Sequence, residues 1–497
     1  MTAKTLMVLG SMSSAGKSLL VTGLCRLYAR RGWGVAPFKA QNMSNNAAVC
    51  RGGEIGRAQA VQAYAAGIDP TVDMNPILLK PQADSISQVV LRGQVWDTFS
   101  ARDYYTRKDL LWQAVTASLD VLKQQYELVI MEGAGSPAEL NLQKSDIVNL
   151  AAARYAGAPC LLAGDIDRGG IFAQLLGTQS LLEEADRQLI RAFIVNKFRG
   201  DPSLFTDGIQ ILEQRGKVPV LGVVPYLKDH GIAEEDAATL GENQSHKPGA
   251  RDFVVIHLPH ISNFDDFDAL RVEPGINLRF VRRLDQLGRP DAVLLPGTKN
   301  TLADLQWLYS SGLAQAVSAL SRKGLPVVGL CGGYQMLGRE ILDDEGIESG
   351  LRSLPGLGLL PVQTRFGLQK MVTHSQAHIH GGYGFFKGIQ GQTLTGYEIH
   401  MGQTVGSRPL FEITARDGLP IQAQDGSCSL DGKVWGSYLH GVLDNDNLRR
   451  AWLKSMDIEP APAPFSQVRS KAYDNLADAL EACLDIARLD SIIKAGL

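Results

Sequence analysis

The chain has 497 residues, of which 45% are hydrophobic and 20% charged, and its formal net charge is −3. This composition favours folded domains over disorder, and the near-neutral charge excludes a strongly basic protein that would need nucleic acid or an anionic membrane as its partner. No run of about 18 consecutive apolar residues occurs, so we expect no transmembrane helix. The six cysteines contain no CxxC pair, which predicts a reducing, cytoplasmic location rather than a disulfide framework or a zinc site.

Short apolar runs alternate with helical stretches in the first half of the chain. Each run is too short for a typical helix, and most have Gly or Pro nearby, so we expect parallel strands joined by helical crossovers. The runs are Thr5–Leu9, Val35–Phe38, Leu128–Met131, Cys160–Ala163, Phe193–Val195 and Val220–Val224. This pattern predicts a doubly wound α/β domain over residues 1–235.

The turn after the first run indicates a phosphate-binding loop. Gly16-Lys17-Ser18 supplies the end of a P-loop, in which backbone N–H groups wrap phosphates, Lys reaches the β/γ-phosphates and Ser binds Mg²⁺. The first glycine is Gly10, so the loop is a variant that is one residue longer between its glycines. A bare Gly-Lys-Ser could belong to any turn, but its position between a strand and an apolar helix favours nucleotide binding.

Polar residues follow other predicted strands of this half. Glu132 ends one strand and is a candidate for holding Mg²⁺ or its water, while Asp165 and Asn196 follow two more. Each residue alone could be a solvated loop residue or a helix cap. Because ligands of open α/β sheets bind beyond the carboxyl ends of the strands, their joint placement predicts a site at that edge.

A second series of alternating runs follows a polar segment, which we interpret as a linker over residues 236–250. The candidate strands are Phe253–Leu258, Ala292–Leu295, Val327–Leu330, Leu357–Leu360 and Val434–Leu439. They predict a second doubly wound α/β domain over 251–445. A helical tail over 446–497 is expected to contain a helix near 446–456, an extended proline-rich stretch and one amphipathic helix near 470–493. That last helix is expected to pack on the body of the protein; the alternative is a partner-binding helix.

Cys331 follows a predicted strand and precedes Gly332 and a helix, which is the geometry of a nucleophile elbow. A helix N-terminus favours the reactive thiolate; the alternative is a buried core cysteine. A thiol nucleophile needs a base, and His440 ends another predicted strand. Backbone N–H groups at Gly297 and Gly332 are candidates for an oxyanion hole. A further group of histidines fits a surface loop better than a metal site: His374, His378 and His380.

The second half resembles the class I, triad-type glutamine amidotransferase domain, through LCGGYQMLG around Cys331, SYLHG around His440 and LPGTKNT at 295–301. This resemblance implies that Cys331 attacks the side-chain amide of glutamine, that a γ-glutamyl thioester forms, and that His440 shuttles the proton while ammonia leaves. Ordinary members carry Glu two residues after the histidine, whereas this chain has Val442. What orients His440 is therefore open.

The first half resembles P-loop ligases similar to dethiobiotin synthetase, through Gly10–Ser18 and the Glu-Gly-Ala-Gly sequence at 132–135. By this resemblance Asn196 contacts adenine. The order of the two halves resembles the cobyric and cobyrinic acid amidating enzymes. The matching segments include 35–46, 165–172, 196–201, 261–264 and 396–402. The resemblance places Lys39, Gln41, Asn42 and Asp165 in the substrate region.

The implied reaction uses ATP and Mg²⁺, with glutamine and a corrinoid as small-molecule substrates and no prosthetic group. It converts the b, d, e and g carboxylates of adenosylcobyrinic acid a,c-diamide into amides, giving adenosylcobyric acid. The nearest alternative is the sibling enzyme that amidates the a and c carboxylates, against which the segment 35–46 argues. A P-loop switch or partition-type ATPase is a further alternative, but such a protein has no use for a glutaminase domain.

Overall fold

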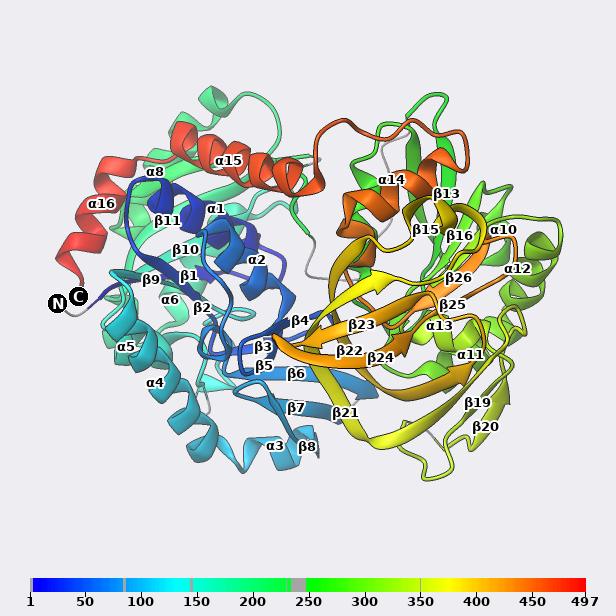
Figure 1. The fold of residues 1–497 in the computed structure, drawn as a ribbon. Helices are drawn as coiled ribbons and strands as arrows, with labels where there is room; N and C mark the ends of the chain where they lie inside the picture. The colour runs from blue at the N-terminus through cyan, green and yellow to red at the C-terminus, as the bar shows by residue number, and fades with distance from the viewer. Residues whose placement is uncertain (1–2, 84–85, 144–145, 229, 234–246, 349) are drawn as a thin grey trace. The chain divides into compact units, whose positions relative to one another are not determined.

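The computed structural model describes residues 3–83, 86–143, 146–228, 230–233, 247–348 and 350–497 (Figure 1). It divides the chain into two units. The first unit comprises Met1–Ser44, Cys50–Glu235 and Arg469–Leu497, and the second comprises Asn45–Val49 and Asp236–Val468. Residues 236–246 of the expected linker lie outside the described residues. The expected tail is divided: α14 (Asp446–Lys454) belongs to the second unit, and the chain from Arg469 onward belongs to the first.

The first unit is built on a six-stranded parallel sheet of order β12-β11-β10-β1-β9-β2. All the strands expected in this half are present. Their bounds are β1 (Lys4–Gly10), β2 (Val35–Phe38), β9 (Leu128–Glu132), β10 (Cys160–Asp165), β11 (Ile190–Phe198) and β12 (Val220–Pro225). Both faces of the sheet are covered by helices, so the strands are apolar almost throughout, which is why they could be predicted.

Alternate residues of β1 pack on opposite faces of this sheet. Leu6 and Val8 pack with α1 and the C-terminal helices, whereas Met7 and Leu9 pack with α4, α5 and α8 (Figure 1). The covering helices are α1 (Lys17–Arg30), α4 (Lys108–Gln125), α5 (Leu150–Ala156), α8 (Thr206–Gly216), α15 (Phe465–Cys483) and α16 (Ile486–Ala495). The C-terminal segment is thus part of the core of the first unit.

The single helix expected near 470–493 is wrong in one respect, because the structure has two helices, α15 and α16. The helix breaks where Leu484 bridges to Gly222 and the backbone N–H of Asp485 donates to the carbonyl of Leu221 at 2.7 Å. The side chain of Asp485 then accepts a hydrogen bond from the N–H of Arg488 at 3.0 Å and so caps α16.

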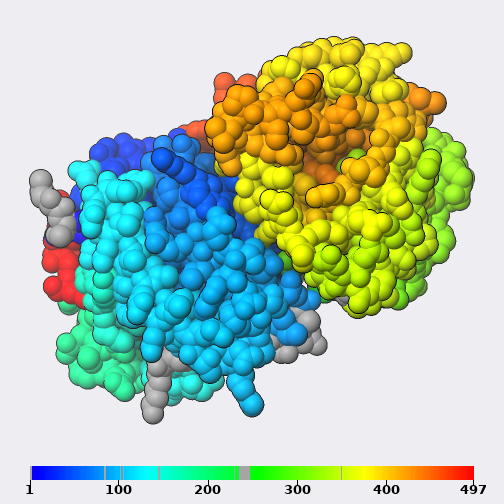
Figure 2. All heavy atoms as spheres, turned by 60° about the horizontal axis from the view of Figure 1, so that its bottom comes forward, coloured from blue at the N-terminus to red at the C-terminus, as the bar shows by residue number. Residues whose placement is uncertain are grey.

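A smaller sheet of order β3-β6-β7-β8 also belongs to the first unit and was not predicted. The apolar runs of β6 and β7 are short, at residues 77–79 and 89–91, and β8 is mostly exposed, so the hairpin was overlooked. Residues of this sheet and of α3 and α4 form much of the surface of the unit in the space-filling view (Figure 2). The remaining elements up to residue 205 are β3 (Gln41–Met43), β4 (Ala47–Cys50), β5 (Gly53–Gly56), α2 (Arg57–Ala65), η1 (Val72–Met74), β6 (Ile77–Ala83), β7 (Ile86–Leu91), β8 (Gln94–Ser100), α3 (Ala101–Tyr105), η3 (Ala173–Gly177), α6 (Thr178–Leu181), α7 (Glu184–Arg187) and η4 (Pro202–Phe205).

The second unit contains a sheet of order β15-β13-β16-β18-β26-β25, parallel except for the β25–β26 pair. Four expected strands lie in it. The strand expected at Leu357–Leu360 is wrong, because 356–361 is irregular and its N–H groups donate to the carbonyls of residues 336–339, at and just after the end of α13. The bounds are β13 (Arg251–Ile256), β15 (Ile276–Val281), β16 (Ala292–Leu295), β18 (Val327–Leu330), β25 (Ser427–Cys428) and β26 (Val434–Ser437). The elements around it are β14 (Ile261–Ser262), η6 (Phe264–Phe267), α9 (Asp268–Arg271), α10 (Leu284–Leu287), β17 (Gly297–Thr298), α11 (Thr301–Ser310), α12 (Leu313–Arg322), α13 (Gly332–Leu337), η7 (Gly384–Ile389) and η8 (Val442–Asp444).

A mostly antiparallel sheet completes the second unit and was also not predicted. Its order is β20-β19-β21-β23-β24, and β22 pairs with β21. The strands are β19 (Glu340–Leu342), β20 (Ser353–Pro355), β21 (Val362–Ile379), β22 (Thr393–Gly406), β23 (Phe411–Arg416) and β24 (Leu419–Asp425). Their alternating exposed and buried residues reflect one solvated face, which hides such strands from a search for apolar runs.

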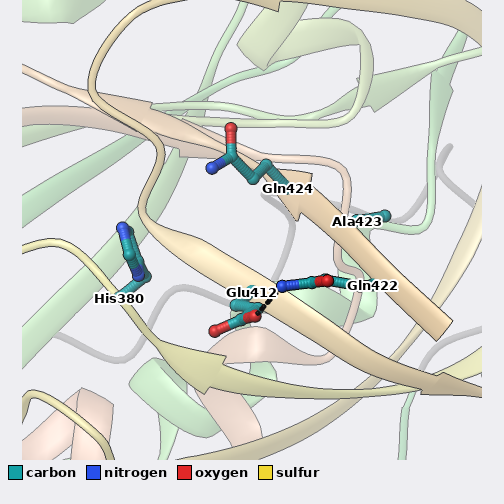
Figure 3. Close-up of a pocket in the computed structure, with 5 residues that line it drawn as sticks. All are labelled: His380, Glu412, Gln422, Ala423 and Gln424. Atoms are coloured by element: carbon teal, nitrogen blue, oxygen red, sulfur yellow. Dashed lines mark hydrogen bonds between the residues drawn. The ribbon is translucent and has the colours of Figure 1, made fainter. Parts of the chain in front are cut away.

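The histidines singled out in the sequence lie on this solvated face. His374, His378 and His380 are all exposed, but the expectation of a surface loop is wrong for His374 and His378, which lie on β21. His380 also borders a surface hollow with Glu412 and residues 422–424 (Figure 3). Within the described part of the chain no group of three or more His, Cys, Asp or Glu side chains is placed to hold a metal ion.

No helix among the described residues is long and apolar enough to cross a membrane.

Candidate active sites

The P-loop links β1 to α1 in the first unit. Gly16 has a φ of 90°, and a Cβ at this position would lie 2.2 Å from Nδ2 of Asn196, so only glycine fits. Lys17 is buried, and its Nζ donates hydrogen bonds to the carbonyls of Met12 and Gly135, each at 3.1 Å. The Nδ2 of Asn196 donates to the carbonyl of Ala15 at 2.8 Å. The loop is therefore held from the ends of neighbouring strands.

A buried carboxylate at the end of β9 joins the P-loop to the expected substrate segment. Oε1 of Glu132 accepts hydrogen bonds from Oγ of Ser18 at 2.9 Å and from Nζ of Lys39 at 2.7 Å. Its Oε2 accepts from Nε2 of Gln62 at 2.5 Å. Lys39 and Glu132 form a buried ion pair. Each charge compensates for the loss of hydration of the other.

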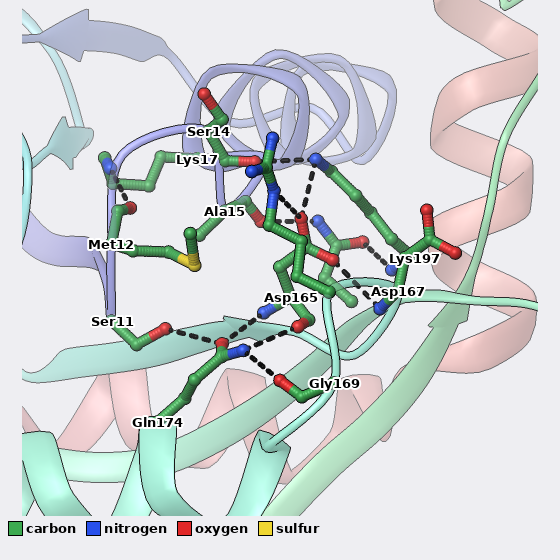
Figure 4. A network of polar contacts seen from close by, with 12 residues as sticks. Ser11, Met12, Ser14, Ala15, Lys17, Asp165, Asp167, Gly169, Gln174 and Lys197 are labelled. Carbon is green, nitrogen blue, oxygen red and sulfur yellow. Dashed lines mark hydrogen bonds and ion pairs between the residues drawn. The ribbon is translucent and has the colours of Figure 1, made fainter.

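A second polar network lies on the other side of the P-loop (Figure 4). Nζ of Lys197 lies 3.0 Å from Oδ2 of Asp165 and donates to the carbonyl of Ser14 at 2.6 Å. Gln174 accepts from Oγ of Ser11 and donates to the backbone carbonyl of Asp165. These contacts attach Asp165 to the loop that is expected to hold phosphates.

The structure separates the four expected substrate-region residues. Lys39, Gln41 and Asn42 form one group, in which Oε1 of Gln41 accepts from the hydroxyl of Tyr104 and Nδ2 of Asn42 donates to Gln59 at 3.1 Å. Asp165 makes its side-chain contacts elsewhere, with Lys197, because β1 lies between β9 and β10. Asp165 therefore lies beside the P-loop, apart from the other three.

The elbow at Cys331 is strained in the way that a nucleophile elbow requires. Cys331 has a φ of 50° and lies directly before α13. A Cβ at position 333 would lie 2.0 Å from the carbonyl oxygen of Leu295, so the turn fits closely against β16 only with glycine there. The thiol lies 3.5 Å from the carbonyl oxygen of Ile399 and is 8% exposed, so it opens only narrowly to solvent.

The side chain that orients His440 is Asp266. Nδ1 of His440 lies 2.7 Å from Oδ2 of Asp266, whose Oδ1 accepts from the N–H of Gly441, also at 2.7 Å. Burial alone would lower the pKa of His440, but the charges of Asp266 and Cys331, and hydrogen bonds with both, raise it to about 10. The geometry is that of a cysteine, a histidine and an acid in hydrogen-bonded succession, which can activate a thiol.

The expected oxyanion residues lie beside this triad. A Cβ on Gly332 would lie 3.1 Å from the backbone N of Thr298, and a Cβ on Gly297 would lie 3.3 Å from Cε1 of His440. The β17 segment therefore lies next to both the nucleophile turn and the base. Close approach of two backbones is what an oxyanion hole made of N–H groups needs.

Sequence reasoning missed Asp266, Gln62 and Lys197. Asp266 lies 174 residues before His440 along the chain, so no local spacing could pair them; the one available signal was its place two residues after the matching segment 261–264. Lys197 lies within a matching segment but was given no role. Gln62 lies on α2 and carried no signal.

Comparison with known proteins assigns the two halves separately and the whole chain together. Residues 6–240 match a CobQ/CobB/MinD/ParA nucleotide binding domain, and residues 252–448 match a CobB/CobQ-like glutamine amidotransferase domain. Proteins named cobyric acid synthase from Sorangium cellulosum and Chloroflexus aurantiacus are each 50% identical to this chain, covering 99% of it and 99% and 100% of their own lengths. The one from Roseiflexus castenholzii is 50% identical over 94% of this chain and 96% of its own.

These relatives are similar across both units and the C-terminal helices, so the likeness is to the whole two-site arrangement rather than to one domain. The chain therefore belongs to the cobyric acid synthase family, glutamine-hydrolysing ligases that carry out an amidation in cobalamin biosynthesis.

Proposed function

We propose that the chain converts the b, d, e and g carboxylates of adenosylcobyrinic acid a,c-diamide into amides, using ATP and ammonia released from glutamine. The observation that carries this proposal is the cluster of Ser18, Lys39 and Glu132, which joins the P-loop to the segment 35–46. That segment separates this reaction from the sibling amidation of the a and c carboxylates. The resemblance of the segment supports the choice of acceptor.

The ligase step needs an activated carboxylate, because hydroxide or oxide is a poor leaving group. In the proposed step a carboxylate oxygen of the corrinoid attacks the γ-phosphorus of ATP, the bond to the β-phosphate oxygen breaks, and an acyl phosphate and ADP form. Ammonia then adds to the acyl carbon and phosphate leaves. Lys17 is placed to stabilise charge on the phosphates, and Lys39 to stabilise charge on the acceptor and the transferred group.

The residues at this site fit Mg²⁺. Ser18 and Glu132 offer oxygen ligands, and Mg²⁺ is usually held by one or two such groups together with the phosphates. When bound, the ion would neutralise the charge that develops on the β- and γ-phosphate oxygens. Asn196 is proposed to contact the adenine.

The proposed glutaminase reaction uses the buried triad. The thiolate of Cys331 attacks the side-chain carbonyl carbon of glutamine, and His440 gives its proton to the departing ammonia, leaving a γ-glutamyl thioester. Water then attacks the thioester, with His440 accepting its proton, and glutamate leaves. Asp266 holds the imidazole in the required orientation, while the N–H groups at positions 297 and 332 stabilise the oxyanion.

Mass spectrometry of the corrinoid products tests this proposal. The protein is incubated with ATP, Mg²⁺ and glutamine, once with cobyrinic acid and once with its adenosylated a,c-diamide. We expect the diamide to gain up to four amides, each replacing one hydroxyl group by NH₂. Consumption of the unamidated acid alone would contradict the proposal and favour the sibling reaction.

A further inference from the structure

The segment Asn45–Val49 belongs to the amidotransferase unit, although Ser44 before it and Cys50 after it belong to the P-loop unit. It continues directly from Lys39, Gln41 and Asn42, which lie in the expected substrate region. The chain thus leads from one candidate site into the other unit within a few residues. Inside the amidotransferase unit, this segment forms hydrogen bonds with Asn263.

Asn46 is 2% exposed, and its Oδ1 accepts a hydrogen bond from the backbone N–H of Asn263 at 2.7 Å. The Nδ2 of Asn263 lies 3.2 Å from the carbonyl oxygen of Ala47. Asn263 has a φ of 51° and lies immediately before η6. Because η6 contains Asp266, the segment fixes the start of the turn that carries the partner of His440.

Asn263 also reaches the other support of the catalytic histidine. Its Nδ2 donates to the hydroxyl of Tyr397 at 3.0 Å. The ring of Tyr397 stacks on the imidazole of His440, with centroids 5.0 Å apart and planes at 16°. The backbones of Tyr397 and His440 also exchange hydrogen bonds of 3.2 and 2.9 Å. Asn263 therefore contacts both groups that hold His440: its side-chain amide donates to Tyr397, and its backbone carbonyl accepts from the N–H of Asp266 at 3.2 Å.

We infer that Asn46, acting through Asn263, is a positioning residue for glutamine hydrolysis. It couples the rate of that reaction to the conformation of the segment 39–46. This inference rests on the proposed function, because the segment must respond to the corrinoid acceptor. A shift of the segment moves Asn263, and through it Asp266 and Tyr397, away from the positions that align the imidazole. Glutamine would then be hydrolysed efficiently only when the segment is held by bound acceptor.

The test compares Asn46→Ala with Asn46→Asp, which keeps the accepting oxygen. Glutamate release is measured with and without ATP and adenosylcobyrinic acid a,c-diamide, together with the ratio of glutamate formed to amide formed and the rate of amidation with added ammonium. For Asn46→Ala we expect about a tenfold loss of the stimulation by acceptor, the size expected for one lost buried hydrogen bond, and a higher glutamate-to-amide ratio. Asn46→Asp should restore most of the stimulation, and amidation with ammonium should change less than about twofold in either variant.

Two further variants separate positioning from folding. Tyr397→Phe removes the hydroxyl that Asn263 contacts while keeping the stacked ring, and should reproduce part of the loss. Asn45→Ala is the matched control, because Oδ1 of Asn45 has no hydrogen-bond partner among the described residues; glutamine hydrolysis in this variant should still be stimulated by acceptor. The inference is overturned if Asn46→Ala keeps normal stimulation and stoichiometry, or if its ammonium-dependent amidation falls equally. Failure of the unmodified chain to amidate the diamide at all would instead contradict the proposed function.

Discussion

The two candidate sites hold their charged groups in different ways. In the P-loop unit, Lys17 donates to the backbone carbonyls of Met12 and Gly135, which are weak partners for an ammonium group, although the neighbouring Lys39 and Lys197 are paired with carboxylates. In the amidotransferase unit, His440 lies against the full charge of Asp266 and both are almost completely buried. A nucleotide can replace carbonyl partners readily, whereas nothing in a glutamine substrate would replace Asp266.

This difference implies two kinds of catalyst. In the proposed reaction, Lys17 gains its best partners, the phosphates, only when the nucleotide binds, so its electrostatic complementarity is completed by binding. The triad is preorganised, so its charges are in place before glutamine enters. The variants below can break or sharpen this contrast, and they are ordered from the largest expected effect to the smallest.

Removing one charged or nucleophilic group from each site should affect amidation with glutamine and amidation with ammonium differently. Cys331→Ala should abolish glutamine-dependent amidation, by at least about 10³-fold, but should keep amidation with added ammonium. Lys17→Ala should abolish amidation with either nitrogen source, because phosphoryl transfer precedes attack by ammonia. Both predictions are checked by measuring the rate of amide formation, once with glutamine and once with ammonium. If the two variants respond alike to ammonium, the sites do not act in sequence.

Removing the partner of His440 tests whether the triad depends on Asp266. Asp266→Asn should lower kcat/KM for glutamine hydrolysis by about 10²–10⁴-fold, because the imidazole loses both its orientation and the stabilisation of its charged form. Amidation with ammonium should be unchanged. Asp268→Asn is a matched control, since that carboxylate lies 3.6 Å from Arg271. Equal losses in both variants would mean that the 264–271 segment had simply lost its structure.

The effect of Asp266→Asn on the free energy of unfolding should depend on pH. Because the pKa of His440 is raised to about 10 in the folded chain, its charged form stabilises the fold fully below the unfolded value near 6.5 and ceases to do so as pH rises through 10. The difference in free energy of unfolding between the unmodified chain and Asp266→Asn should therefore be larger at pH 7 than above pH 10. Chemical denaturation at the two pH values measures it. A constant difference would show that the pair is not held as an ion pair.

The contrast also explains what could be predicted from the sequence. The P-loop, the strand ends and the elbow at Cys331 depend on residues adjacent in the chain, and their apolar runs follow from sheets buried on both faces. Asp266 could not be paired with His440, because only the packing of η6 against η8, which follows His440, brings them together. The strands β21 to β24 were missed for a related reason, since one solvated face removes the apolar runs. The break between α15 and α16 depends on contacts with β12.

A second buried carboxylate of the amidotransferase unit tests preorganisation by its effect on stability. Burial would raise the pKa of Glu398, but hydrogen bonds from His400, Arg416 and Ser375 lower it to about 2. The stabilisation is therefore present above the unfolded value near 4.5 and is lost as pH falls toward 2. Glu398→Gln should lower the free energy of unfolding by about 3 kcal/mol at pH 6, and by much less near pH 3.

Denaturant titrations at the two pH values measure this difference. The control is Glu412→Gln on β23 of the same sheet, whose carboxylate accepts from Gln422 at 3.1 Å near the surface. It should change the free energy of unfolding by less than about 1 kcal/mol. A loss in Glu398→Gln that does not depend on pH would mean that packing, rather than charge, makes Glu398 important.

The smallest effect on stability is expected from the surface ion pair between α1 and the C-terminal helix α15. Arg26 of α1 lies 2.9 Å from Asp474 of α15, but their side chains are 20% and 38% exposed, so water and salt screen the pair. A double-mutant cycle with Arg26→Ala and Asp474→Ala should give a coupling energy of about 0.5 kcal/mol, which disappears in 1 M salt. The helix should stay docked in both variants, because Leu476 and Leu480 pack against Gly23. A coupling energy that is several times larger and insensitive to salt would show that α15 is held by a fixed charge pair, as His440 is, rather than by apolar packing alone.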